Sequence, residues 1–192
     1  MKLRIALVDE TQTVNEMIQE SLEAAGHEVV ALLSPGQDLV SHVQQTLPDM
    51  MVINVKVPDH AFLQNIAEVN REQPIPIVLF SEVDGQDLVD SIVQCGVSAY
   101  VVDGLEANRL EPIINVARAR FTQMQGLRDE LANAKQVLDE RKKIDRAKGI
   151  IMERRGCNEE EAYQSLRKVA MDKNQRIAVV ADSIISAAEV LG

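Results

Sequence analysis

The stretch LRIALVDE, residues 3–10, decides the fold of the first half of this chain. Its apolar run at residues 3–8 is typical of a strand that is buried on both faces of a parallel sheet. The run ends at Asp9-Glu10 and no glycine-rich turn follows, which excludes a dinucleotide fingerprint and a phosphate-cradling loop. The stretch predicts an α/β sheet with acidic side chains at the carboxyl end of its first strand.

Short apolar runs and amphipathic segments alternate as far as residue 105. Further strands are expected at 28–33, 50–54, 77–80 and 99–102, with helices at 14–25, 38–46, 61–70 and 86–95. Five strand-helix repeats predict a doubly wound, flavodoxin-like sheet of five parallel strands, with helices on both faces. The functional site of such a sheet lies at the carboxyl ends of its strands.

Charge is distributed unevenly along the 192 residues, although the chain as a whole carries a net charge of −10. Residues 1–121 hold seven basic and eighteen acidic residues, whereas residues 122–192 hold thirteen and twelve. Two modules with different partners are therefore expected. The two cysteines, Cys95 and Cys157, are too far apart to indicate a disulfide framework or a zinc cluster. With no apolar stretch of membrane-spanning length, a cytoplasmic protein is expected.

Side chains at the predicted strand ends resemble those of the receiver domain of two-component response regulators, over residues 1–121. The resemblance rests on Asp9-Glu10, on Asn54 four residues before Pro58, on Ser81 and on residues 96–104. In that family the acidic pair holds Mg²⁺, an aspartate accepts a phosphoryl group, a Ser or Thr binds the phosphate, and a lysine neutralises it. Asp9, Glu10 and Ser81 match this pattern, but Asn54 stands at the acceptor position and Asp103 at the lysine position.

The two departures determine the expected chemistry of this pocket. An amide has no anionic oxygen to attack phosphorus, so Asn54 should not form an acyl phosphate. Asp103 would repel an incoming phosphate, and the loss of one anionic ligand weakens Mg²⁺ binding. We expect a protein-binding and dimerising platform that takes no phosphate, metal or cofactor. The three histidines, His27, His42 and His60, are expected at solvated or turn positions.

A long helix is expected from about residue 106, and it carries a narrow apolar stripe. The stripe, called the seam below, has 3-4-3-4 spacing and consists of Met124, Leu127, Leu131, Ala134 and Leu138. Such a stripe is typical of a short parallel coiled coil. It could also pack back on the first domain, and the charged flanks favour the dimer. Residues 122–140 are interpreted as a coiled-coil linker.

Residues 141–155 hold seven basic and two acidic residues, a local charge of +5 in an acidic chain. A break at Gly156, a helix capped by Asn158 and a final amphipathic helix from residue 177 would complete a three-helix module at residues 141–192. The charged stretch is either a solvated surface or a helix face that binds the phosphates of a nucleic-acid backbone, and composition alone does not decide between the two.

The amino-acid sequence of this module resembles the ANTAR domain of the AmiR/NasT transcription antitermination regulators. The matching segments are DRAKGIIM at 145–152, Gly156, EEAY at 160–163, Leu166-Arg167, Ala170-Met171 and Val180-Ala181. The resemblance covers residues 128–192, and the first domain is closest to the NasT branch. It implies RNA binding, with contacts from Lys142, Arg146, Lys148, Gly149, Arg154, Arg155 and Arg167. Tyr163 would either stack on a base or pack within the module.

The resemblance implies a non-enzymatic antiterminator that binds paired stem-loops in leader mRNA and prevents formation of a terminator. It further implies a homodimer, nitrate or nitrite assimilation genes as targets, and an inhibitory nitrate/nitrite-sensing protein as partner. The alternative is a phosphorylated regulator that binds DNA or a protein target. The acidic start of the helix at 159–173 disfavours a DNA recognition helix, and no DNA or membrane partner is expected. An enzyme on this scaffold would need a cofactor loop after the first strand.

Overall fold

The computed structural model describes residues 2–10, 12–102 and 107–191, which form two compact units, Met1–Gln125 and Gly126–Gly192. Each unit has a hydrophobic core of its own, and helix α5, Ala107–Arg155, continues across the boundary. Within the described residues, no helix combines the length and the apolar run that crossing a membrane requires.

The first unit confirms the predicted doubly wound α/β fold. Its strands are β1 Arg4–Asp9, β2 Glu28–Leu33, β3 Met50–Asn54, β4 Ile77–Ser81 and β5 Ala99–Val102. They form one parallel sheet in the order β2-β1-β3-β4-β5. The chain reverses its winding between β1 and β3, and this reversal places the carboxyl ends of those two strands side by side.

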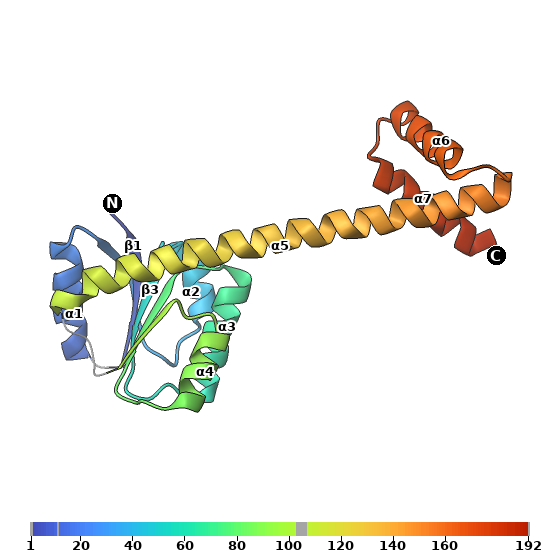
Figure 1. Cartoon of the computed structure of the whole chain (residues 1–192). Helices are drawn as coiled ribbons and strands as arrows, with labels where there is room; N and C mark the ends of the chain where they lie inside the picture. Colours follow the sequence, from blue (N-terminus) through green and yellow to red (C-terminus); the bar gives the residue numbers. More distant parts are fainter. Residues whose placement is uncertain (1, 11, 103–106, 192) are drawn as a thin grey trace. The chain divides into compact units, whose positions relative to one another are not determined.

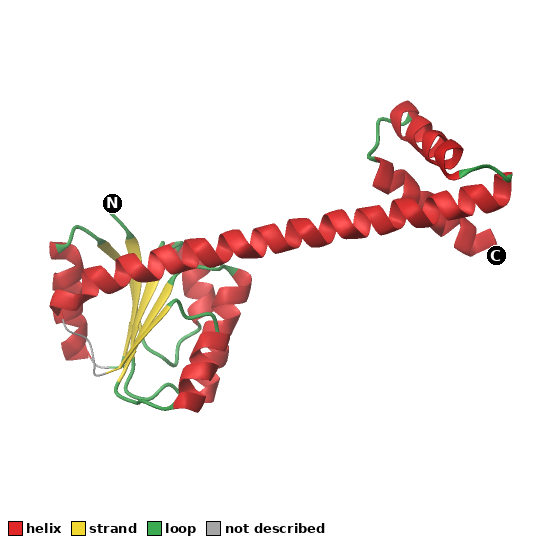
Figure 2. Cartoon of the chain, viewed as in Figure 1, coloured by secondary structure: helices red, strands yellow, loops and turns green. Residues whose placement is uncertain are grey.

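Helices cover both faces of the sheet (Figures 1 and 2). They are α1 Gln12–Ala24, α2 Leu39–Thr46, α3 His60–Glu72 and α4 Gln86–Gln94, together with the start of α5. One core lies between the sheet and α1 and α5, and the other between the sheet and α2, α3 and α4. The central strands β1, β3 and β4 are mainly apolar because both of their faces are buried, whereas the edge strands β2 and β5 are partly exposed.

Local sequence signals account for several helix ends in this unit. Asp38 and Asp59 cap α2 and α3, each through a side-chain oxygen that accepts a backbone N–H of the first turn. Gly96 follows α4 with a φ of +86°, and a Cβ there would lie 2.0 Å from the Asn70 amide nitrogen. Both constraints require glycine at this position.

His27 lies in the short turn region between α1 and β2, one of the two expected alternatives, but it is not solvated, because it is 7% exposed. Its Nδ1 accepts a hydrogen bond from the Leu3 N–H at 3.3 Å, and its Nε2 lies 2.8 Å from Glu111 Oε2. An accepting Nδ1 places the ring proton on Nε2, which then donates to the carboxylate. The bond from His27 lowers the pKa of Glu111, and the two bonds of the His27 ring together link α5 to Leu3, which precedes β1.

The second unit packs the end of α5 against α6, Glu159–Asp172, and α7, Ile177–Leu191. Its core contains Ala147 and Ile151 from α5, Leu166 from α6, and Ala181 from α7. Gly156, at φ +64°, follows the last residue of α5. Asn158 then caps α6 in a reciprocal capping box with Glu161, so the predicted break and cap are both confirmed.

Candidate functional site

The receiver pocket is built around Asp9 and Asn54, which are register partners at the ends of β1 and β3. The Asn54 amide donates a hydrogen bond to Asp9 Oδ1 at 3.0 Å. Asp9 is 3% exposed, so the anionic oxygen accepts this bond away from bulk water. The amide at the acceptor position therefore stabilises the first acidic residue directly.

Glu10 and Ser81 interact with the loop that follows β3. The Glu10 carboxylate accepts the Lys56 backbone N–H at 3.1 Å. The Ser81 hydroxyl, 1% exposed, donates to the Lys56 carbonyl at 2.7 Å and accepts the Val83 N–H at 3.3 Å. Both side chains hold backbone of the pocket in place, and Ser81 is almost closed off from solvent.

A set of three carboxylates would suit a magnesium ion, but the described part of this pocket has two carboxylates and the amide of Asn54. Asp9 and Glu10 each accept a protein N–H, and Asn54 turns a donor toward Asp9. No group of three metal-ligating His, Cys, Asp or Glu side chains occurs among the described residues. We assign no metal to the pocket. Asp103, predicted at the position of the family's lysine, lies outside the described residues.

The seam lies on the solvent-exposed middle part of α5. Met124, Leu127, Leu131 and Leu138 are each between 53% and 57% exposed, and Ala134 is exposed as well. Four large apolar side chains in one narrow stripe on a charged helix favour contact with a second helix.

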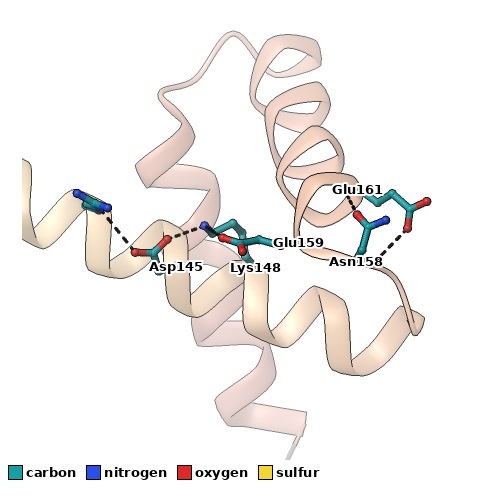
Figure 3. Close-up of polar contacts among 6 residues, drawn as sticks. Asp145, Lys148, Asn158, Glu159 and Glu161 are labelled. Carbon is teal, nitrogen blue, oxygen red and sulfur yellow. Dashed lines mark hydrogen bonds and ion pairs between the residues drawn. The ribbon is translucent and has the colours of Figure 1, made fainter.

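Lys148 differs from the other predicted RNA-contacting residues, because it is held within the second unit. Its ammonium lies 2.6 Å from Asp145 Oδ1 and 2.7 Å from Glu159 Oε1 (Figure 3), and its side chain is 14% exposed. The bonds with Asp145 and Glu159 raise the pKa of Lys148, and the same contact lowers that of Asp145. Since Glu159 opens α6, this group, called the Lys148 clamp below, joins α5 to the first turn of α6.

The other predicted basic residues are more exposed than Lys148. Arg146 pairs with Glu189 of α7 at 2.8 Å, and Lys142 lies 3.8 Å from Asp139. Arg154 and Arg167 are exposed and have no carboxylate partner in the described part of the chain. The Cβ position of Gly149 faces open space.

The structure contains a groove at the end of α5 that the sequence did not predict. It has a volume of about 240 Å³, and Arg154, Arg155 and Ser165 lie among its lining residues. Its apolar lining includes Val169 and Ile184, which helical spacing alone assigns to the core. Tyr163 is 38% exposed and lies outside the core cluster, so the interpretation as a packing residue is not supported.

Family models match both units. The response regulator receiver domain matches residues 5–115, more than half of the chain, and the ANTAR domain matches residues 132–185. The chain belongs to the response regulators that carry a receiver domain and an ANTAR domain. It is of the AmiR/NasT type, as the sequence motifs predicted.

Two relatives of this ANTAR regulator are named as regulatory proteins. The transcriptional regulatory protein PdtaR of Mycobacterium tuberculosis is 28% identical over 189 residues, which cover 98% of this chain and 91% of PdtaR. The nitrate regulatory protein of Klebsiella oxytoca is 40% identical over 74 residues, or 38% of this chain and 19% of that protein.

Solved structures agree on the fold of the first unit. A LuxR-family two-component response regulator from Aurantimonas sp. SI85-9A1 has a TM-score of 0.55 at 22% identity, and covers 62% of this chain and 86% of its own. The receiver domain of the response regulator NarL from Mycobacterium tuberculosis has a TM-score of 0.53 at 21% identity. The match covers 60% of this chain and 96% of the NarL receiver chain. These likenesses concern the fold alone.

Proposed function

We propose that this ANTAR regulator is a dimeric, cytoplasmic RNA-binding antiterminator. It binds two adjacent stem-loops in a leader mRNA and so prevents the terminator hairpin from forming. The observation that carries the proposal is the exposed pair Arg154 and Arg155 at the end of α5, inside the segment that the ANTAR model matches. Local positive charge attracts the phosphate backbone even where the chain as a whole is acidic.

The proposed RNA contacts come from surface cations and not from the clamp. Lys142, Arg146, Arg154, Arg155 and Arg167 are exposed and can exchange weak or absent protein partners for phosphates. Gly149 lets the backbone of RNA approach α5. Lys148 holds α5 against the start of α6 and so fixes part of the surface that presents these cations, and we assign it a positioning role. The corresponding domain assignment is a receiver at 1–121, a stem at 122–140 and an RNA module at 141–192.

Dimerisation through the seam would place two RNA modules on one particle. Each module would then engage one stem-loop, and the second contact would benefit from the effective concentration that the first creates. The exposed apolar residues Leu127 and Leu131 support this part of the proposal.

Control of this regulator would come from a protein partner and not from phosphorylation. The Asn54 amide stands at the acceptor position and donates to Asp9, so no anionic oxygen is aimed at an incoming phosphorus. The partner would be an inhibitory nitrate/nitrite-sensing protein, and the targets nitrate or nitrite assimilation genes. The similarity of part of this chain to the nitrate regulatory protein of Klebsiella oxytoca supports this choice.

The experiment compares the binding of full-length protein to a leader RNA with two stem-loops and to duplex DNA of the same sequence. Fluorescence anisotropy over a series of salt concentrations should show preference for the RNA and a steep loss of affinity with salt. Equal binding to both nucleic acids would reject the RNA assignment. Incubation with acetyl phosphate and Mg²⁺, followed by mass spectrometry, should show no added phosphoryl group.

A further inference from the structure

The groove at the end of α5, called the end groove, is made by three helices of the second unit. Ten residues line it, among them Arg154, Arg155, Ser165, Val169, Ile184 and Ala187. Seven of these ten side chains are apolar, and the volume is about 240 Å³. The end groove is therefore a concave apolar surface within the domain that we propose to bind RNA.

The charges at the end groove favour an anionic occupant. Of the ten described residues that line it, two are arginines and none carries a carboxylate. The guanidinium of Arg155 donates to Ser165 Oγ at 3.5 Å, which leaves the hydroxyl proton of Ser165 available for another acceptor. The rim thus offers two cations and one hydroxyl donor beside an apolar floor.

This combination matches the chemistry of one unstacked nucleotide. A loop base has apolar faces and polar edges, and its flanking phosphates are anionic. Arginine can pair with phosphate and also stack on a base plane, whereas an apolar peptide would gain nothing from two guanidinium groups at the rim.

We infer that the end groove receives one unstacked base of an RNA loop. The base packs on Val169 and Ile184, Ser165 donates to its edge, and Arg154 and Arg155 hold the adjacent phosphates. This inference rests on the proposed RNA binding and adds to it a subsite that reads the loop.

The test uses full-length protein and an RNA selected by that protein from a synthetic library of paired stem-loops with randomised loops. Ala187→Phe fills the end groove, and Ser186→Phe places the same ring on the same helix outside its lining. Circular dichroism checks that both variants fold. Ala187→Phe should lower the affinity for the selected RNA about ten- to a hundredfold, and Ser186→Phe should change it less than about threefold.

Abasic substitution of each loop nucleotide identifies the inserted base. One position should weaken binding to the wild type and have no further effect on Ala187→Phe, because both changes remove the same contact. Independent losses at every position would overturn the inference. Photo-crosslinking of wild-type protein to 4-thiouridine in the loop needs no variant, and should modify Val169 or Ile184; crosslinks elsewhere would contradict it.

Other outcomes distinguish this inference from the proposed function. If Ala187→Phe binds RNA like the wild type, the end groove does not take a base, and RNA binding stands. If Ala187→Phe changes the oligomeric state in sedimentation experiments, the end groove is a contact between copies, and the inference fails. If selection returns no RNA that binds, both proposals fail.

Discussion

Asn54 and Asp9 are paired across neighbouring strands, and the amide of one donates to the carboxylate of the other at 3.0 Å. In a receiver with an aspartate at this position, two carboxylates would face each other and repel unless a cation lay between them. Asparagine replaces that repulsion with a hydrogen bond to a charged acceptor. Asn54 thus holds the Asp9 side chain by a hydrogen bond, where a second carboxylate would need a cation.

Asn54→Asp should make the stability of the receiver depend on magnesium. The new carboxylate would lie beside Asp9, so the melting temperature of this variant should fall in EDTA and recover when millimolar Mg²⁺ is added. Differential scanning fluorimetry with and without Mg²⁺ measures the effect. The wild type should show no such response.

Asn54→Ala is the matched control for this experiment. It removes the hydrogen bond to a charged group, at a cost of about 1.5–3 kcal/mol, without adding charge. Its melting temperature should therefore fall to the same extent in both buffers. A magnesium response in wild type as large as that of Asn54→Asp would contradict the account.

His27→Ala should destabilise the receiver unit by about 1–3 kcal/mol, because the buried Leu3 N–H loses its acceptor. Urea denaturation measures the change. His60→Ala serves as control, because His60 is an exposed residue of α3 and its loss should cost less than about 0.5 kcal/mol. Similar losses for both variants would show that the buried histidine has no special role.

The Lys148 clamp should make the second unit sensitive to acid. Lys148 lowers the pKa of Asp145 from its ordinary value of 3.8. A carboxyl whose folded pKa is depressed contributes stability above its unfolded pKa, and loses that contribution as pH falls through the folded value. Wild type should therefore melt at a higher temperature than Asp145→Asn near neutral pH, and this difference should shrink below about pH 4. A constant difference across this range would rule out the clamp as a stabilising contact.

Leu131→Glu should dissociate the dimer proposed here, since it places a charge in the middle of the seam. Analytical ultracentrifugation should show a monomer at concentrations where wild type is dimeric. Gln136→Glu introduces the same side chain at an exposed position of α5 outside the seam, and should leave the dimer intact. A monomeric wild type would refute the role of the seam.

The strand pattern of the first unit was predictable, because all five strands, including the partly exposed edge strands β2 and β5, are short runs of mainly apolar residues. The runs at 28–33, 50–54 and 99–102 were predicted with the observed limits, and β1 and β4 differ by one residue at their ends. The cap at Asn158 was predictable for a similar reason, since its donors and acceptors lie within four residues of one another.

Contacts between distant segments were not predictable in the same way. His27 is buried because Leu3 and Glu111, far away in sequence, both bond to its ring. Lys148 was grouped with the RNA-contacting cations because helical spacing cannot show that Glu159 folds back to meet it. The end groove depends on the packing of three helices, so its apolar residues Val169 and Ile184 were interpreted as core, and Arg154 and Arg155 were predicted as separate RNA contacts.

The measurement that tests the central claim most directly is transcription in vitro through a leader with two stem-loops that overlap a terminator. Wild-type protein should raise the fraction of transcripts that read through the terminator. It should do so without prior incubation with acetyl phosphate and Mg²⁺. The double variant Arg154→Glu and Arg155→Glu should leave termination unchanged while its fold remains intact. Unchanged termination with wild-type protein that demonstrably binds this RNA would contradict the account.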